Sequence, residues 1–118
     1  MKTWTPLLLA ILSTFSTLAI ANSDIDTSPK GSTKTTVAKV VTYSQFGQGD
    51  VVFKLTTSED SCPDGYWMTR SDPGFDANLS VLLAAHLAKS EVIAHGYPHK
   101  RWAGSTGKYC LLYAIELF

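Results

Sequence analysis

The stretch Asn78–Tyr97, NLSVLLAAHLAKSEVIAHGY, contains a change of hydrophobic period that decides the predicted fold. In its first half, apolar residues recur every three or four positions, which predicts a helix with Asn78 as its N-cap and an end near Lys89 and Ser90. In its second half, residues 91–97 have the composition of a β-strand. The residues assigned to the buried stripe of the helix are Leu79, Leu82, Leu83, His86 and Leu87.

Four more predicted strands complete the fold. Residues 36–46, 51–57 and 66–70 are rich in β-branched and aromatic residues, and the turn 47–50, GQGD, joins the first two segments as a hairpin. Residues 109–117, YCLLYAIEL, are apolar at nearly every position, which predicts a central strand buried on both faces. The order predicts a mainly β fold, a small five-stranded OB-type barrel with one helix between strands three and four.

Residues 1–21 have the features of a secretory signal peptide. Lys2 gives a positive start, the run from Pro6 to Ile20 is apolar apart from hydroxyls, and Ala19-Ile20-Ala21 is a small-x-small cleavage pattern. We therefore expect cleavage after Ala21, a secreted or periplasmic protein, and no membrane span in the mature form. A membrane anchor is the alternative, because the uncharged stretch is long, but no basic stop-transfer cluster follows it.

The remaining chain is long enough for one small domain. Residues 22–35 are rich in Ser, Thr, Gly and Pro without apolar periodicity, so we predict a flexible leader at 22–35 and a single OB-like domain at 36–118. The sequence has ten Lys and Arg and ten Asp and Glu, so removal of Lys2 leaves nine against ten and a net charge of −1. This balance argues against a nucleic acid or an anionic membrane surface as the partner.

Cys62 and Cys110 are the only cysteines of the sequence. Because an exported chain meets an oxidising compartment, we predict that they form a disulfide. Such a bridge closes a loop of about fifty residues and stabilises the fold by about 4 kcal/mol in the chain-entropy model. A reactive or metal-binding thiol is the alternative, but no CxxC or Cys/His ligand spacing supports it.

The histidines do not form a recognisable catalytic or metal-binding pattern. His86 lies on the predicted apolar stripe, where a hydrogen-bonded packing role accounts for it. His95 and His99 are four residues apart, but Gly96 and Pro98 exclude the helix on which this spacing joins two metal ligands. We therefore predict a protein that is not an enzyme, with no catalytic residues, no metal and no cofactor.

Aromatic and polar side chains gather in two predicted loops, as they do in sugar-binding sites. Sugars present apolar C–H faces to aromatic rings and hydroxyls to polar side chains. The candidate ligand-binding residues are Tyr97, Lys100, Arg101 and Trp102 after the fourth strand, and Tyr43, Gln45 and Gln48 near the first hairpin. We expect Tyr66 and Trp67 to pack over the disulfide and Tyr109 and Tyr113 to be structural. For Trp102 the sequence leaves core packing and ligand contact equally open.

The order of elements resembles that of a known group of exported proteins. Together with Cys62, Trp67, the stretch LSVLLAAHLAKSEVIAHGY and Cys110 in the last strand, it is similar to small bacterial proteins that resemble the OB-fold B subunits of AB5 toxins, in particular the subtilase-cytotoxin type. The hairpin VVTYSQFGQGD also resembles the opening strand of those subunits. The likeness covers about Thr36 to Leu117, and it implies a bacterial source, a five-stranded barrel, a ring-shaped homo-pentamer and a host glycan as ligand.

One sugar-contacting residue of the toxin subunits has no counterpart in this sequence. In those subunits a serine stands just ahead of the paired valines of the first strand, whereas here residues 35–39, TTVAK, precede Val40 and Val41. The resemblance therefore implies no sialic-acid contact at this position. We predict an exported non-catalytic binding module, a glycan-binding protein of the toxin-B-subunit kind. The alternative is a periplasmic structural or inhibitory protein that binds another protein and no sugar.

Overall fold

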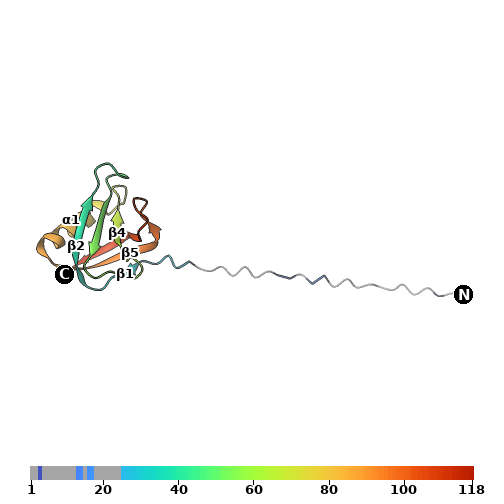
Figure 1. The fold of residues 1–118 in the computed structure, drawn as a ribbon. Coiled ribbons are helices and arrows are strands. Elements are labelled where there is room, and N and C mark those ends of the chain that lie inside the picture. The colour runs from blue at the N-terminus through green and yellow to red at the C-terminus, as the bar shows by residue number, and fades with distance from the viewer. Residues whose placement is uncertain (1–2, 4–12, 15, 18–24) are drawn as a thin grey trace.

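The structure is a computed structural model that describes residues 25–118 together with residues 3, 13, 14, 16 and 17. Most of the predicted signal peptide, 1–21, lies outside the described residues. In the described part the chain is mainly β, with six strands and one helix (Figure 1). The elements are β1 (Lys30–Gly31), β2 (Thr35–Thr42), β3 (Val51–Leu55), β4 (Gly65–Met68), α1 (Phe75–Ala88), β5 (Glu91–Arg101) and β6 (Tyr109–Leu117). None of the described helical residues makes a helix with the length and apolarity needed to cross a membrane.

The pairings of the five longer strands form a closed ring. β2 pairs with β3, β3 with β4, β5 with β6 and β2 with β5, all antiparallel, while β4 and β6 pair in parallel. The short strand β1 pairs with β5 at Gly96 and His95. Residues 30–35, which belong to the predicted flexible leader, thus include β1 and the start of β2, so the sheet begins before residue 36.

β5 is longer than the predicted strand 91–97, and it continues to Arg101. Tyr97 pairs with Leu111 and Arg101 with Cys110, so that residues 98–100 form a bulge with no partner on β6. Pro98 fits within this bulge because no ladder hydrogen bond requires its missing N–H group. The prediction of a strand at 91–97 is confirmed, whereas the prediction that a loop begins after Tyr97 is wrong for residues 98–101.

β6 has the predicted bounds, but it is not buried on both faces. Cys110 and Leu112 point into the core, whereas Tyr113, Glu116 and Leu117 are exposed. The reason is that the outer face of the ring meets solvent, so apolar residues there do not indicate burial. The prediction of a structural, packed Tyr113 is also wrong, since 56% of that residue is exposed.

The helix begins one turn earlier than predicted. Its N-cap is Gly74, and the Asn78 amide donates to the Gly74 carbonyl, so Asn78 lies within the helix and is not its cap. The early start follows from Phe75, which is buried in the core at the first helical position. The predicted end is correct, because Lys89 adopts the left-handed conformation that closes a helix and Ser90 donates to the Ala85 carbonyl.

Only part of the predicted helical stripe is buried. Leu82 is buried together with Ala85, whereas 40% of Leu83 and 83% of Leu87 are exposed. The prediction failed at these positions because α1 carries apolar residues on all sides, so that periodicity does not single out one face. His86 has the predicted packing role, with its Nδ1 3.0 Å from the Val37 carbonyl oxygen.

The predicted disulfide between Cys62 and Cys110 is present, with both residues buried and their Cα atoms 5.5 Å apart. It joins the loop before β4 to the start of β6. Tyr66 is buried beside it, in register with Cys110 and stacked on Phe53 at 5.2 Å between ring centroids. Since structural disulfides persist in oxidising compartments, this bond indicates such a compartment for the chain.

Removal of the disulfide tests its contribution to stability. The Cys62→Ser/Cys110→Ser variant should lose about 2–5 kcal/mol of unfolding free energy, because its unfolded state is no longer restrained by the closed loop. Urea unfolding of the oxidised parent and the variant measures the difference. Reductant should destabilise the parent and leave the variant unchanged, and equal unfolding midpoints in the oxidised parent and variant would contradict the account.

Candidate functional site

Trp102 is buried, and its indole joins two segments that are far apart in the sequence. Only 6% of the residue is exposed, and its Nε1 donates a 2.9 Å hydrogen bond to Oδ2 of Asp50, which is also buried. The other oxygen of Asp50 accepts from the Gln48 amide at 3.3 Å. Asp50 therefore ties the segment after β5 to the loop between β2 and β3, and the ring of Trp102 is a support rather than an exposed contact surface.

Three aromatic rings pack around this support. The centroids of Tyr43, Phe46 and Tyr109 lie 5.4, 5.4 and 5.5 Å from the ring of Trp102. We call these four residues the Trp102 cluster. Tyr43 is 37% exposed and Phe46 is 39% exposed, so both combine a packed side with a side that faces solvent.

The loop between β2 and β3 holds Tyr43 and Phe46 in a defined conformation. The Tyr43 amide donates to the Asp50 carbonyl at 2.8 Å, and the Gly49 and Asp50 amides both donate to the Phe46 carbonyl. Gly47 has a φ of 61°, and a Cβ there would collide with the Asp50 carboxylate. A glycine is therefore required, and the conformation of the loop depends on the placement of Asp50.

A groove adjoins the Trp102 cluster on the outer face of β2 and β3. Lys39 pairs with Lys54 and Val41 with Val52, so these four side chains share one face of the hairpin. Together with Tyr43, Phe53 and Tyr109 they line a hollow of about 110 Å³, which we call the β2–β3 groove.

Lys54 and Tyr109 approach each other at one side of this groove. The Lys54 amine lies 5.9 Å from the ring centroid of Tyr109, which pairs with Gly65 of β4. A Cβ at this residue would collide with the Phe53 carbonyl oxygen. Within the described part of the chain, neither Lys39 nor Lys54 forms an ion pair, so both amines are available as hydrogen-bond donors.

Two of the predicted site residues lie on a separate surface, formed by β5 and β6. The ring of Tyr97 lies 5.3 Å from that of Tyr113 and 5.6 Å from that of His99, and the Lys100 amine lies 5.2 Å from the Tyr97 centroid. We call these four residues the β5–β6 platform. The structure thus brings Tyr97 together with Lys100 and brings Tyr43 together with Trp102, but it separates the two pairs.

The other predicted residues make fewer contacts. Arg101 is exposed at the end of β5. Gln45 and Gln48 line an open polar hollow of about 430 Å³ with Ser44 and Arg70. Trp67 is only partly buried, contrary to prediction, and its Nε1 donates to the Lys100 carbonyl at 3.0 Å across the outer face.

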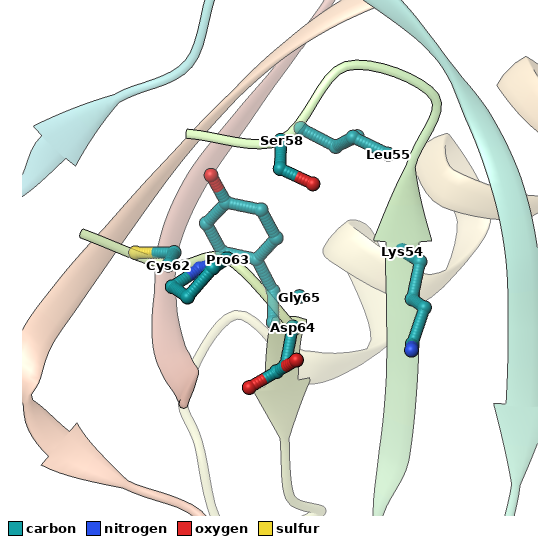
Figure 2. Close-up of a pocket in the computed structure, with 8 residues that line it drawn as sticks. Lys54, Leu55, Ser58, Cys62, Pro63, Asp64 and Gly65 are labelled. Carbon is teal, nitrogen blue, oxygen red and sulfur yellow. The ribbon is translucent and has the colours of Figure 1, made fainter. Parts of the chain in front are cut away.

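A further hollow, of about 160 Å³, lies beside the disulfide on the other side of Lys54 (Figure 2). Ser58 and Asp64 lie at opposite ends of this hollow (Figure 2). Tyr66 also lines it, and among the described residues its hydroxyl is buried without a hydrogen-bond partner. Burial raises the pKa of this hydroxyl above its usual range, and the charge of Glu59 adds to the rise, so that Tyr66 stays protonated.

The histidines do not converge on a common site. The His95 Nε2 atom lies 2.9 Å from the Glu116 carboxylate, and His99 belongs to the β5–β6 platform. His86, on α1, contacts the Val37 carbonyl of β2. Within the described residues, no three His, Cys, Asp or Glu side chains lie close enough together to hold a metal ion.

Lys39, Lys54, Phe46 and Asp50 also belong to the site, although none of them is predicted from the sequence as a site residue. The alternation of Lys39, Val41 and Tyr43 along one strand was a signal for the shared face of the groove. The role of Asp50 had no such signal, because its partner Trp102 is 52 residues away.

Comparison of the chain with protein-family models, curated proteins and solved structures found no match.

The hydrogen bond between Trp102 and Asp50 can be tested by removing its donor. Trp102→Phe should lower the unfolding free energy by about 1–3 kcal/mol, because it leaves a buried carboxylate oxygen unpaired. Trp67→Phe is the matched control, since it removes an indole donor from a bond near the surface, and it should cost less. Thermal or urea unfolding of both variants compares the two losses, and a smaller loss for Trp102→Phe would be inconsistent with the supporting role of Trp102.

Proposed function

We propose that this chain is an exported, non-catalytic binding module of the OB type that recognises a glycan at the Trp102 cluster and the β2–β3 groove. The closed ring of pairings and the position of α1 between β4 and β5 support the assignment to an OB-type barrel. Barrels of this type bind oligosaccharides at one sheet face and at the loops after the first and fourth strands of the barrel. In this chain, Trp102 and Asp50 connect those two loops.

The observation that carries the proposal is the pair of half-exposed rings on a buried support. Tyr43 and Phe46 each present a side to solvent, and their positions are held by Trp102 and the loop hydrogen bonds. Rings that are already held in place lose little conformational freedom when a ligand binds. The Lys39 and Lys54 amines beside them supply donors for sugar hydroxyl or carboxylate oxygens.

Export and bacterial origin belong to the same proposal. The disulfide fits a secreted or periplasmic location, and the predicted signal peptide supplies the route. The resemblance to B subunits of AB5 toxins adds that the glycan belongs to a host cell and that copies assemble into a homo-pentamer.

We place the contact between copies on the exposed side of α1. The last two turns of this side carry the exposed residues Leu83, Ala84, Leu87 and Ala88, and its first turn carries the exposed Asp76. Exposed apolar surface of this kind is typical of protein contacts. The same surface is the observation that favours the alternative function, a periplasmic structural or inhibitory protein whose partner is another protein.

Glycan binding is tested by truncation of the two half-exposed rings. The Tyr43→Ala/Phe46→Ala variant should lose at least about tenfold in affinity for any saccharide that the parent binds on a glycan array, because stacking area is removed. Because more than half of each residue is packed, the variant should also lose unfolding free energy, so its affinity is measured at a temperature at which it is fully folded.

Phe118→Ala is the matched control, because Phe118 is an exposed ring at the far end of β6 and should not affect saccharide binding. A parent chain that binds no saccharide on the array would overturn glycan recognition and leave the protein-binding alternative.

The assembly contact is tested by the Leu83→Gln/Leu87→Gln variant. Both residues are exposed in the single chain, so the folded domain should keep its stability within about 1 kcal/mol. Light scattering with size exclusion should show a pentamer for the parent and a smaller species for the variant. A parent that is monomeric at every concentration would contradict the pentamer.

A further inference from the structure

We propose that the β5–β6 platform is a second saccharide-binding surface, and that the ligand is a chain of several sugars that contacts the platform and the β2–β3 groove at once. This inference rests on the proposed function and specifies its ligand as a polysaccharide or long oligosaccharide. A single terminal sugar would occupy only the groove.

The first step of the argument is the exposure of Tyr113. More than half of this residue is exposed, and on the outer face of β6 its ring is not needed to fill the core. Its contact with Tyr97 holds the two rings at an interplanar angle of 70°, so that one ring edge supports the other. Such an arrangement keeps an apolar ring surface available to the C–H face of a sugar.

The second step is the set of polar groups around these rings. The Lys100 amine lies over Tyr97, and the imidazole of His99 lies against the same ring. In the described part of the chain, neither Lys100 nor His99 forms an ion pair. The platform therefore offers donors for hydroxyl oxygens around an aromatic surface, as the β2–β3 groove does with its two lysines.

The third step is the position of the platform relative to the groove. Val52 of the groove pairs with Trp67, Trp67 with Leu111, and Leu111 with Tyr97. This path runs round the closed ring, and a shorter one follows β6, where Tyr109 of the groove and Tyr113 of the platform are four residues apart, or about 13 Å at about 3.3 Å per residue. This separation is too long for one sugar ring and suits a chain of sugars.

The segment between the two surfaces is held in place rather than free. The Trp67 indole donates to the Lys100 carbonyl, and Trp102 two residues later is fixed by Asp50. Because both anchors are rigid, the spacing between platform and groove is set before the ligand arrives. Simultaneous contact then raises the affinity for a long ligand through effective concentration.

The experiment measures how affinity depends on saccharide length. Native gels containing laminarin, yeast mannan or alginate identify a polysaccharide that retards the full mature chain, and size-graded fragments of that polymer are then titrated by calorimetry. For the parent, affinity should rise by at least about tenfold once a fragment is long enough to reach both surfaces. The Tyr113→Ala/Lys100→Ala variant should lose that rise and keep the affinity of the parent for the shortest binding fragment.

Two other variants separate the possible failures. Tyr43→Ala/Phe46→Ala should lose affinity for short and long fragments alike, and Phe118→Ala should behave as the parent. If the platform variant binds every fragment as tightly as the parent, the second surface is refuted and the groove is unaffected. If the parent binds no fragment, no polysaccharide and no saccharide on the array, the proposed function itself is refuted.

Discussion

The hydrogen bond from Trp102 to the buried carboxylate of Asp50 is the interaction on which the candidate site depends. A carboxylate out of contact with water is unfavourable unless donors surround it, and here the indole and the Gln48 amide supply them. The bond holds the segment after β5 against the β2–β3 loop. The rings of Tyr43 and Phe46 pack against the Trp102 ring that this bond fixes. The conformation of one loop therefore determines that of the other, and the site is formed by both.

The scaffold beneath this contact is stabilised by constraints of a different kind. The ring of pairings leaves no long free edge between the five longer strands, and the disulfide fastens the loop before β4 to β6. Gly65 is required where β4 passes close to the Phe53 carbonyl, because a Cβ at this residue would collide with the carbonyl oxygen.

The sequence predicted what local chemistry determines. Four features could be predicted because each follows from a pattern or a residue type within a short stretch. They are the end of α1, the bounds of β6, the disulfide and the packing of His86. The continuation of β5 to Arg101 and the burial of Trp102 could not be, since both depend on a bulge around Pro98 and on a partner in another loop. Tyr97 and Trp102 are close in sequence, yet this bulge places them on different surfaces.

The two aromatic surfaces share one outer face of the sheet, and rigid contacts define the distance between them. The most direct test of the central claim is NMR of the labelled chain during titration with a bound saccharide. The account predicts that the Trp102 indole N–H is protected from hydrogen exchange before and after binding, and that signals of Tyr43, Phe46 and Lys54 shift. An indole N–H that exchanges at the rate of free tryptophan, or shifts confined to α1, would contradict it.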